Sequence, residues 1–163
     1  MSGRIKRGEG TLIGDAGEYA VMSELLKQGV VAALAPRNAP WFDILATNGP
    51  KTVRIRVKTK SHDQDNWQWN ARKDDTIFRH LSDRDDFVVA VDLAPVGQLN
   101  GFFIIPTRVI DKWLKDDFTA WKSTPGKRGQ VRDPANRRRI LWTAKFLPMM
   151  EPYRGDWTLL WKD

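Results

Sequence analysis

The sequence predicts an α/β protein in which helices flank a central mixed β-sheet, with the element order αβββαβ. Three observations indicate this class. Apolar residues recur at helical spacing over residues 15–28 and again over residues 107–121. Apolar and basic residues alternate strictly over residues 53–60, as they do in a half-buried strand. Two short apolar runs, residues 86–93 and 101–105, have the length and composition of buried strands.

The first helix is expected over residues 15–28, with Gly29 as its C-terminal stop. Its apolar face comprises Tyr19, Met22, Leu25 and Leu26. Asp15, followed three residues later by Glu18, is typical of a capping arrangement at a helix N-terminus. Residues 1–14 contain basic residues and glycines without a clear period, so we expect them to form a flexible basic arm.

Three strands are expected next, at residues 30–34, 41–47 and 53–60. In the third strand one face is apolar, and the other face carries Arg54, Arg56, Lys58 and Lys60. Four cations at alternate positions repel one another, so this face predicts an anionic group nearby. A solvated face is the alternative.

The second half of the chain is expected to begin with a helix at residues 74–81. The strands at residues 86–93 and 101–105 follow, and then a helix over residues 107–121 with Thr107 as its cap. The expected elements after this helix are a long basic loop at residues 123–139, a strand within residues 139–146 and a short apolar tail at residues 155–161.

Length and composition bound the class of protein. A chain of 163 residues fits one domain spanning residues 1–163. The absence of cysteine excludes disulfides, thiolate catalysis and cysteine-ligated zinc, and it fits a cytoplasmic location. No apolar run is long enough to span a bilayer, so no membrane partner is expected. The net charge of +7 is compatible with a polyanionic partner such as nucleic acid.

Three segments together carry a family resemblance: Gly17-Glu18-Tyr19-Ala20 on a helix, residues 42–46 (FDILA) on a strand, and Arg56-Val57-Lys58-Thr59 on the next strand. They resemble the PD-(D/E)XK nuclease superfamily, and most of all its archaeal Holliday-junction-resolvase-like and small endonuclease-like members. The match covers about the first 60 residues. The resemblance implies a restriction-endonuclease-like core.

In that family the helix contributes a glutamate, the second strand an aspartate, and the third strand an acid-x-lysine motif. The resemblance therefore implies Glu18 and Asp43 as ligands of Mg²⁺ or Mn²⁺, together with the carbonyl of Val57. It also implies Lys58 as the catalytic lysine. A divalent cation held by carboxylates neutralises charge in phosphodiester hydrolysis and activates water.

Arg56 departs from this pattern, because it occupies the position of the motif acid. At about 4 Å and an effective dielectric near 20, each unit of charge is worth roughly 4 kcal/mol. A guanidinium should therefore repel the cation or pair with Asp43. Asp63 and Asp65, just beyond the lysine strand, are candidates for a migrated ligand.

Each acid also has a structural interpretation. Glu18 can be no more than the capping partner of Asp15. Asp43 lies in an apolar run and needs a partner, either a functional one or a structural salt bridge.

Candidate nucleic-acid contacts lie outside these acids. Trp67 and Trp69 can stack on bases or pack over the sheet. The basic loop can contact phosphates or be a solvated surface. The full set expected to contact nucleic acid is Arg54, Arg56, Lys60, Trp67, Trp69, Lys127, Arg128, Arg137, Arg138 and Arg139.

Three function hypotheses follow. The first is a metal-dependent DNA endonuclease-like protein with a degenerate acid-x-lysine motif, whose activity Arg56 puts in question. The second is a catalytically inactive DNA- or RNA-binding module in which Arg56 pairs with Asp43. The third is a protein-interaction domain on the same fold. The resolvase-like relatives also suggest a homodimer.

Overall fold

The computed structural model describes residues 9–39, 41–79 and 84–163. Its elements, in chain order, are the helix α1 (Glu9–Lys27), the strands β1 (Val31–Leu34), β2 (Ile44–Thr47), β3 (Thr52–Ser61), β4 (Asn66–Asn70), β5 (Asp86–Leu93) and β6 (Gly101–Pro106), the helix α2 (Thr107–Ser123), the strand β7 (Arg138–Trp142), the helix α3 (Thr143–Met150) and the 3₁₀ turns η1 (Glu151–Tyr153) and η2 (Trp157–Leu160).

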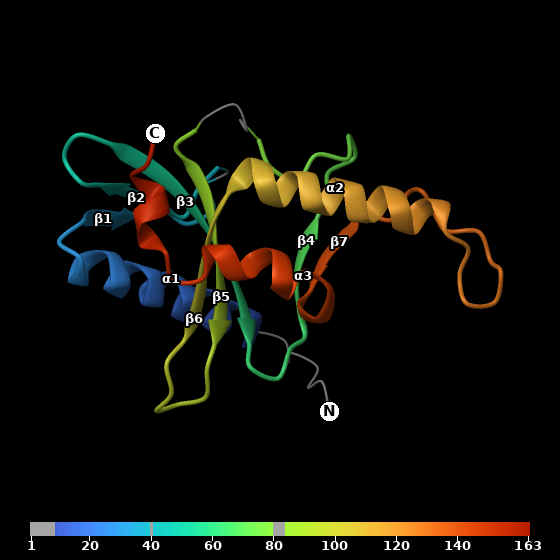
Figure 1. The fold of residues 1–163 in the computed structure, drawn as a ribbon, viewed down its shortest axis with the longest axis horizontal. Coiled ribbons are helices and arrows are strands. Elements are labelled where there is room, and N and C mark those ends of the chain that lie inside the picture. The colour runs from blue at the N-terminus through green and yellow to red at the C-terminus, as the bar shows by residue number, and fades with distance from the viewer. Residues whose placement is uncertain (1–8, 40, 80–83) are drawn as a thin grey trace.

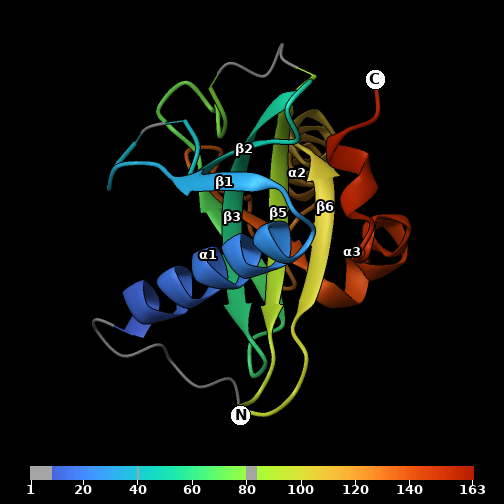
Figure 2. The same ribbon diagram turned by 90° about the vertical axis from the view of Figure 1, so that its left-hand side faces the viewer.

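Five strands form the central sheet, in the order β1-β2-β3-β5-β6. The pair β3–β5 is parallel, and the other three pairs are antiparallel, so the sheet is mixed. β4 and β7 form a separate antiparallel pair. Figure 1 shows this pair beneath α2, and Figure 2 shows α1 crossing the opposite face of the sheet. The predicted class, a mixed sheet with helices on both faces, is confirmed.

The two faces of the sheet have separate cores because side chains alternate along each strand. Along β5, Phe87, Val89 and Val91 belong to the core on the α1 side. Val88 and Ala90 belong to the core beneath α2, α3 and the β4–β7 pair. A strand buried on both faces reads as a continuous apolar run, as the sequence does here.

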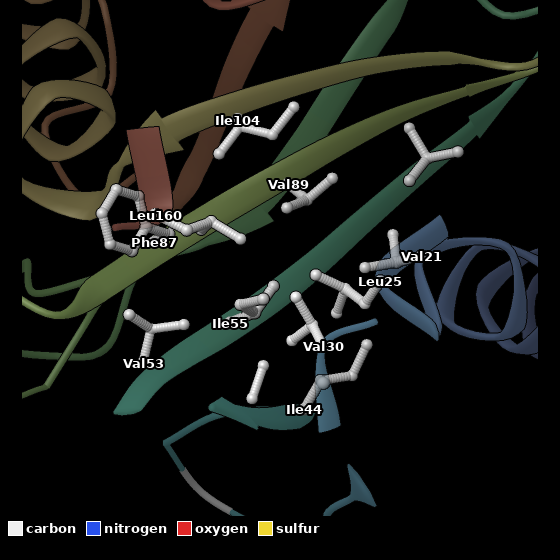
Figure 3. Packing of buried hydrophobic residues seen from close by; sticks show 12 residues of the cluster. Val21, Leu25, Val30, Ile44, Val53, Ile55, Phe87, Val89, Ile104 and Leu160 are labelled. Atoms are coloured by element: carbon white, nitrogen blue, oxygen red, sulfur yellow. The ribbon is translucent and has the colours of Figure 1, made fainter. Parts of the chain in front are cut away.

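The core on the α1 side fixes this helix over the sheet. Figure 3 shows Val21 and Leu25 of α1 beside Val30 and Ile44, close to Ile55 of β3. All five side chains are buried. The position of α1 relative to β3 therefore follows from apolar packing.

The N-terminal prediction needs correction. α1 begins at Glu9, six residues before the predicted start, so residues 9–14 are helical and do not belong to an arm. Residues 1–8 lie outside the described residues. Ile13 of this extension and Val57 of β3 line the same hollow of the surface. Asp15 is inside the helix, so the predicted capping arrangement is wrong.

The predicted helix at residues 74–81 is also wrong in its described part. Residues 74–79 form turns and bends without helical hydrogen bonding, and Asp75 has a φ of 62°, which a right-handed helix excludes. Asp74 accepts hydrogen bonds from the backbone N–H and the hydroxyl of Thr76, which stabilises a local turn instead. Residues 80 and 81 lie outside the described residues.

The C-terminal third contains a helix that the sequence did not predict. The strand expected within residues 139–146 ends at Trp142, and α3 follows directly. The basic loop occupies residues 124–137, close to its predicted bounds. Thr107 is the first residue of α2 and follows the N-cap Pro106, so it is not the cap. Among the described helices, none combines the length and apolar character needed to cross a bilayer.

Candidate functional site

Asp43 immediately precedes the start of β2, beside β3. Its backbone N–H donates to the carbonyl of Ile55 at 2.9 Å. Its carboxylate accepts a hydrogen bond from the backbone N–H of Val57 at 2.7 Å. The Asp43 carboxylate thus accepts the hydrogen bond that a longer β2 would have accepted through its backbone. This bond holds the side chain at the edge of β3 beyond the end of the β2–β3 pairing. N–H and C=O of one residue point to the same side of a strand, so the Val57 carbonyl faces the same side as Asp43.

Glu18 is brought to the same region by a close approach of α1 to β3. A Cβ added at Gly17 would overlap the hydroxyl of Thr59, so only glycine permits this approach. The next residue, Glu18, lines a hollow of about 340 Å³ together with Asp43 and Asp15. Arg37 also lines this hollow and contacts Asp15 at 3.3 Å.

The two acids are electrostatically coupled. Burial raises the pKa of Glu18, and the negative charges of Asp43 and Asp15 raise it further, against Arg37, which lowers it. Burial also raises the pKa of Asp43, although the Val57 N–H, Arg56 and Lys58 lower it. Two carboxylates whose ionised forms are disfavoured are stabilised by a bound cation.

Lys58, on β3, lies close enough to Asp43 for the two charges to interact. It lines a second hollow of about 370 Å³, together with Val57 and the amide side chains of β4 and its preceding turn, including Gln68. Its ammonium lies 5.6 Å from the centroid of the Trp69 ring. Burial lowers the pKa of Lys58, and the charge of Asp43 raises it. Glu18, Asp43 and Lys58, from α1, the start of β2 and β3, therefore form one coupled group.

Arg56 does not pair with Asp43, contrary to one expectation from the sequence. Its guanidinium forms an ion pair with Asp86, a buried residue at the start of β5. It also donates to the carbonyl of Arg79 at 3.0 Å, and its Nη1 lies 3.4 Å from the hydroxyl of Thr107. Parallel pairing sets Arg54 opposite Asp86, which brings this carboxylate within reach of Arg56. Burial lowers the pKa of Arg56, and Asp86 raises it.

The residues present fit a weakly held divalent cation. Mg²⁺ needs only one or two carboxylates when waters and substrate phosphates complete its shell. Glu18 and Asp43 could supply these carboxylates, since the charge of Asp43 raises the pKa of Glu18 and both line one hollow. The carbonyl of Val57 lies on the side of β3 that faces Asp43. In the described part of the chain there is no group of three acidic, histidine or cysteine side chains that could hold a metal.

The candidates for a migrated ligand do not join this group. Asp63 accepts a hydrogen bond from the hydroxyl of Ser61, and Asp65 accepts one from Asn66 at 2.8 Å. Both residues are exposed in the turn between β3 and β4.

The basic face of β3 has an internal anionic partner at each end. Asp86 pairs with Arg56 and lies 3.7 Å from Nε of Arg54. Asp92, at the other end of β5, pairs with Lys60 at 2.6 Å. Lys60 is 4% exposed. The anionic neighbour that the alternation predicts is therefore, at least for Arg56 and Lys60, supplied by β5 and not by a bound polyanion.

Aromatic side chains cover the same cations. Lys60 lies 5.0 Å from the Trp67 ring, and Arg56 lies 5.4 Å from the Phe78 ring. Trp67 is 1% exposed and donates its indole N–H to the carbonyl of Val91 at 3.0 Å. In this conformation Trp67 cannot stack on a base, so its expected nucleic-acid contact is wrong. Trp69 is half-buried above Lys58.

The basic loop divides into exposed and buried cations. Lys127, Arg128, Arg137 and Arg138 are exposed. Arg139 is 3% exposed, pairs with Asp75 at 3.0 Å and lies 3.4 Å from the centroid of the Phe118 ring. The expected phosphate contact of Arg139 is therefore wrong, because this side chain holds the start of β7 in place.

Comparisons with solved structures give several matches, among them the following two. A bacterial homing endonuclease, I-Ssp6803I, is 20% identical, with a TM-score of 0.46 over 92% of this chain and 89% of that chain. Hjc, a Holliday junction resolvase from the archaeal hyperthermophile Archaeoglobus fulgidus, is also 20% identical, with a TM-score of 0.39 over 58% of this chain and 73% of that chain. No family model and no curated protein matches the sequence.

Sequence reasoning missed the two acids that neutralise the basic strand face. Asp86 and Asp92 stand near the two ends of the apolar run of β5, a pattern visible in the sequence. Only the parallel pairing of β3 with β5 shows that they meet the cations. Arg37 and Gln68 were also missed, because the hollows that they line form only in three dimensions.

Proposed function

We propose that the chain acts on nucleic acid and that Glu18, Asp43 and Lys58 form a divalent-cation-dependent phosphodiester-cleaving site. The supporting observation is the coupling of the three groups. Two carboxylates have raised pKa values, and a lysine beside them has a lowered one. Neighbouring groups with opposed pKa shifts are typical of catalytic sites.

Each residue has a distinct role in this proposal. Glu18 and Asp43 hold the cation with the Val57 carbonyl, and the bound cation supplies charge neutralisation and activation of water. The Val57 N–H fixes the Asp43 carboxylate in one orientation. Lys58 faces the phosphate and stabilises its developing negative charge.

Arg56 weakens this site less than its charge alone implies. The ion pair with Asp86 is neutral as a unit, and Asp43 keeps the Val57 N–H as its hydrogen-bond donor. The positive charge still acts on Asp43, because Arg56 lowers the pKa of this carboxyl more than Lys58 does. We therefore expect slow cleavage and a preference for high cation concentration.

DNA is the proposed substrate class. The net charge of +7 and the exposed cations Lys127, Arg128, Arg137 and Arg138 favour a polyanion. Phosphate contacts of this kind give affinity that falls steeply with salt.

The test is cleavage of duplex, single-stranded and branched DNA in Mg²⁺ or Mn²⁺. Asp43→Asn and Lys58→Gln should each abolish the cleavage seen with wild type. Asp65→Asn removes an exposed acid outside both hollows and serves as the matched control. Cleavage that persists equally in Asp43→Asn and Lys58→Gln would overturn the assignment of the site.

A second candidate function is nucleic-acid binding without cleavage. The observation that favours it is Arg56, which stands at the acid position with a full set of partners. In this case wild type, Asp43→Asn and Lys58→Gln all bind DNA with the same salt dependence, and none of them cleaves it. Binding that is absent at low salt would contradict both candidates.

A further inference from the structure

A third hollow that could take a ligand lies away from the candidate cleavage site, between α2 and β7. It has a volume of about 150 Å³ and is lined by Phe118 and Trp121 of α2 and by Arg138 and Trp142 of β7. In Figure 1 this region is next to the loop that extends beyond the C-terminal end of α2. The hollow is aromatic on two sides and basic at its rim.

Trp142 is the exposed ring of this hollow. It is 41% exposed, although tryptophan is a residue that proteins bury on average. Within the described part of the chain, its ring contacts no other aromatic ring and no cation. On the α2 side of the hollow, Phe118 and Trp121 stack on each other with ring centroids 5.6 Å apart. Arg132 lies 5.0 Å from the Trp121 ring.

The charge around the hollow is positive. Residues 126–140 contain six basic residues and one acidic residue. Among the described residues, Lys127, Arg128 and Arg137 pair with no carboxylate. Asp117 is the one acid among the lining residues, and it is paired with Lys145. Of the two arginines that line the hollow, Arg139 pairs with Asp75, whereas Arg138 donates to a neutral amide and has no carboxylate partner.

A polar path connects this hollow with Lys58. Arg138 donates to the side chain of Gln68 at 2.9 Å. Gln68 in turn lines the hollow that contains Lys58. Gln68 and Arg138 lie on the paired strands β4 and β7. A polyanion that passes Lys58 can therefore continue across the β4–β7 pair to the aromatic hollow.

We infer that this hollow seats one unpaired base of a single-stranded nucleic acid, stacked on Trp142, with the neighbouring phosphates on Arg138 and the loop cations. Flat apolar rings next to cations match the two parts of a nucleotide, the base and the phosphate. The inference rests on the proposed action on nucleic acid. It adds that the bound part of the substrate is single-stranded.

The test compares two labelled probes of equal length and charge, a thymidylate oligomer and a wholly abasic DNA oligomer. Binding is measured by fluorescence anisotropy in EDTA, so the result does not depend on cleavage. Wild type should bind the thymidylate oligomer about tenfold more tightly than the abasic one. Trp142→Ala should reduce this ratio to near one, and Trp142→Phe should keep most of it.

Two further variants separate stacking from charge. Arg138→Gln should weaken both probes alike and reduce the salt slope by about one. Val131→Ala removes an exposed apolar side chain of the same loop that does not line the hollow, and it should change neither probe. A uridylate oligomer that shows the same Trp142-dependent preference supports the seat and indicates RNA as a substrate.

Three outcomes overturn the inference. They are equal affinity of wild type for the two DNA probes, an unchanged ratio in a folded Trp142→Ala variant, and displacement of the probe by an acidic peptide as readily as by unlabelled thymidylate. The comparison in wild type decides the question by itself if Trp142→Ala does not fold. If wild type prefers the thymidylate oligomer but cleaves no DNA in Mg²⁺, the base-binding hollow is supported and the proposed cleavage site is rejected.

Discussion

Arg56 and Asp86 form an ion pair that closes one end of the β3–β5 pair, with 14% of the Arg56 side chain and 2% of the Asp86 side chain exposed. The hydroxyl of Thr107 donates to the same carboxylate at 2.6 Å. Asp86 is therefore the centre of a small buried network that joins β3, β5 and the start of α2.

Removing Asp86 should destabilise the protein strongly. In Asp86→Ala the guanidinium of Arg56 is left without its counter-ion in a desolvated place, and such changes cost about 3–5 kcal/mol. Asp116→Ala breaks an exposed ion pair with Lys112 and is the matched control, with an expected loss of about 0.5 kcal/mol. Urea unfolding measures both. Equal losses in the two variants would contradict the assigned network.

Restoring the motif acid requires two changes. Arg56→Glu alone sets a carboxylate against Asp86, so we expect this variant to be poorly folded. The double variant Arg56→Glu/Asp86→Asn removes the repulsion and brings a third carboxylate toward Glu18 and Asp43. We expect it to bind Mn²⁺ roughly tenfold or more tightly than wild type, because affinity follows the number of charged ligands. Calorimetric titration, with Asp86→Asn as control, tests this; equal affinities would contradict it.

Divalent cations should stabilise the folded protein. A cation bound only by the native state at 100 times its dissociation constant adds about 2.7 kcal/mol, which is visible as a higher melting temperature. Glu18→Gln and Asp43→Asn should each remove most of this increase, while Asp63→Asn should keep it. Differential scanning fluorimetry with Mg²⁺, Mn²⁺ and EDTA measures the shift. An identical shift in all variants would place the cation elsewhere.

The raised pKa values of Glu18 and Asp43 predict the sign of a pH effect. Their folded-state pKa values lie above the ordinary values of 4.5 and 3.8, so the native state binds these protons first. Their contribution to stability therefore grows as the pH falls through the raised pKa values and is lost as the pH rises.

The matched variant isolates this contribution. Glu18→Gln/Asp43→Asn should be more stable than wild type at pH 7 in EDTA, and the difference should shrink toward pH 4. Urea unfolding at several pH values measures the difference between the two proteins, so other titrating groups cancel. A difference that grows as the pH falls would have the wrong sign.

Gly17 should be intolerant of a side chain. In Gly17→Ala the new methyl group overlaps Thr59, and Thr59 cannot escape by rotation because its Cβ is also within 2.8 Å. Overpacking of this kind costs about 1–3 kcal/mol. Gly14→Ala meets nothing within 4 Å and should stabilise α1 by up to about 1 kcal/mol. Thermal unfolding compares them, and Thr59→Ala should partly rescue Gly17→Ala. The prediction fails if both glycine variants are stabilised.

The central sheet could be predicted from the sequence because its strands carry strong local signals. The two-residue alternation of β3 and the continuous apolar run of β5 each specify a strand and its burial. β4 carries a weaker signal, since Trp67 and Trp69 alternate with Asn66, Gln68 and Asn70. Its pairing partner, β7, lies far along the chain, so no local pattern identifies it.

The candidate site could be predicted only in part. The family resemblance of the sequence indicated Glu18, Asp43 and Lys58, and in the structure Asp43 lies near both of the others. The partner of Arg56 could not be read from the sequence, because Asp86 is brought to β3 by parallel pairing across an intervening segment. The sequence also did not predict that aromatic residues of β4 cover the basic face of β3.

The β4–β7 pair has a consequence for the order of folding. Gln68 lies opposite Ile140, about 70 residues later in the chain. The entropy of closing a long loop delays such pairing until the intervening chain is organised. The central sheet should therefore assemble first, and the tryptophan-bearing strand should close over its lysines last. In native-state hydrogen exchange, we expect the amides of β4 and β7 to open at lower free energy than those of β3 and β5.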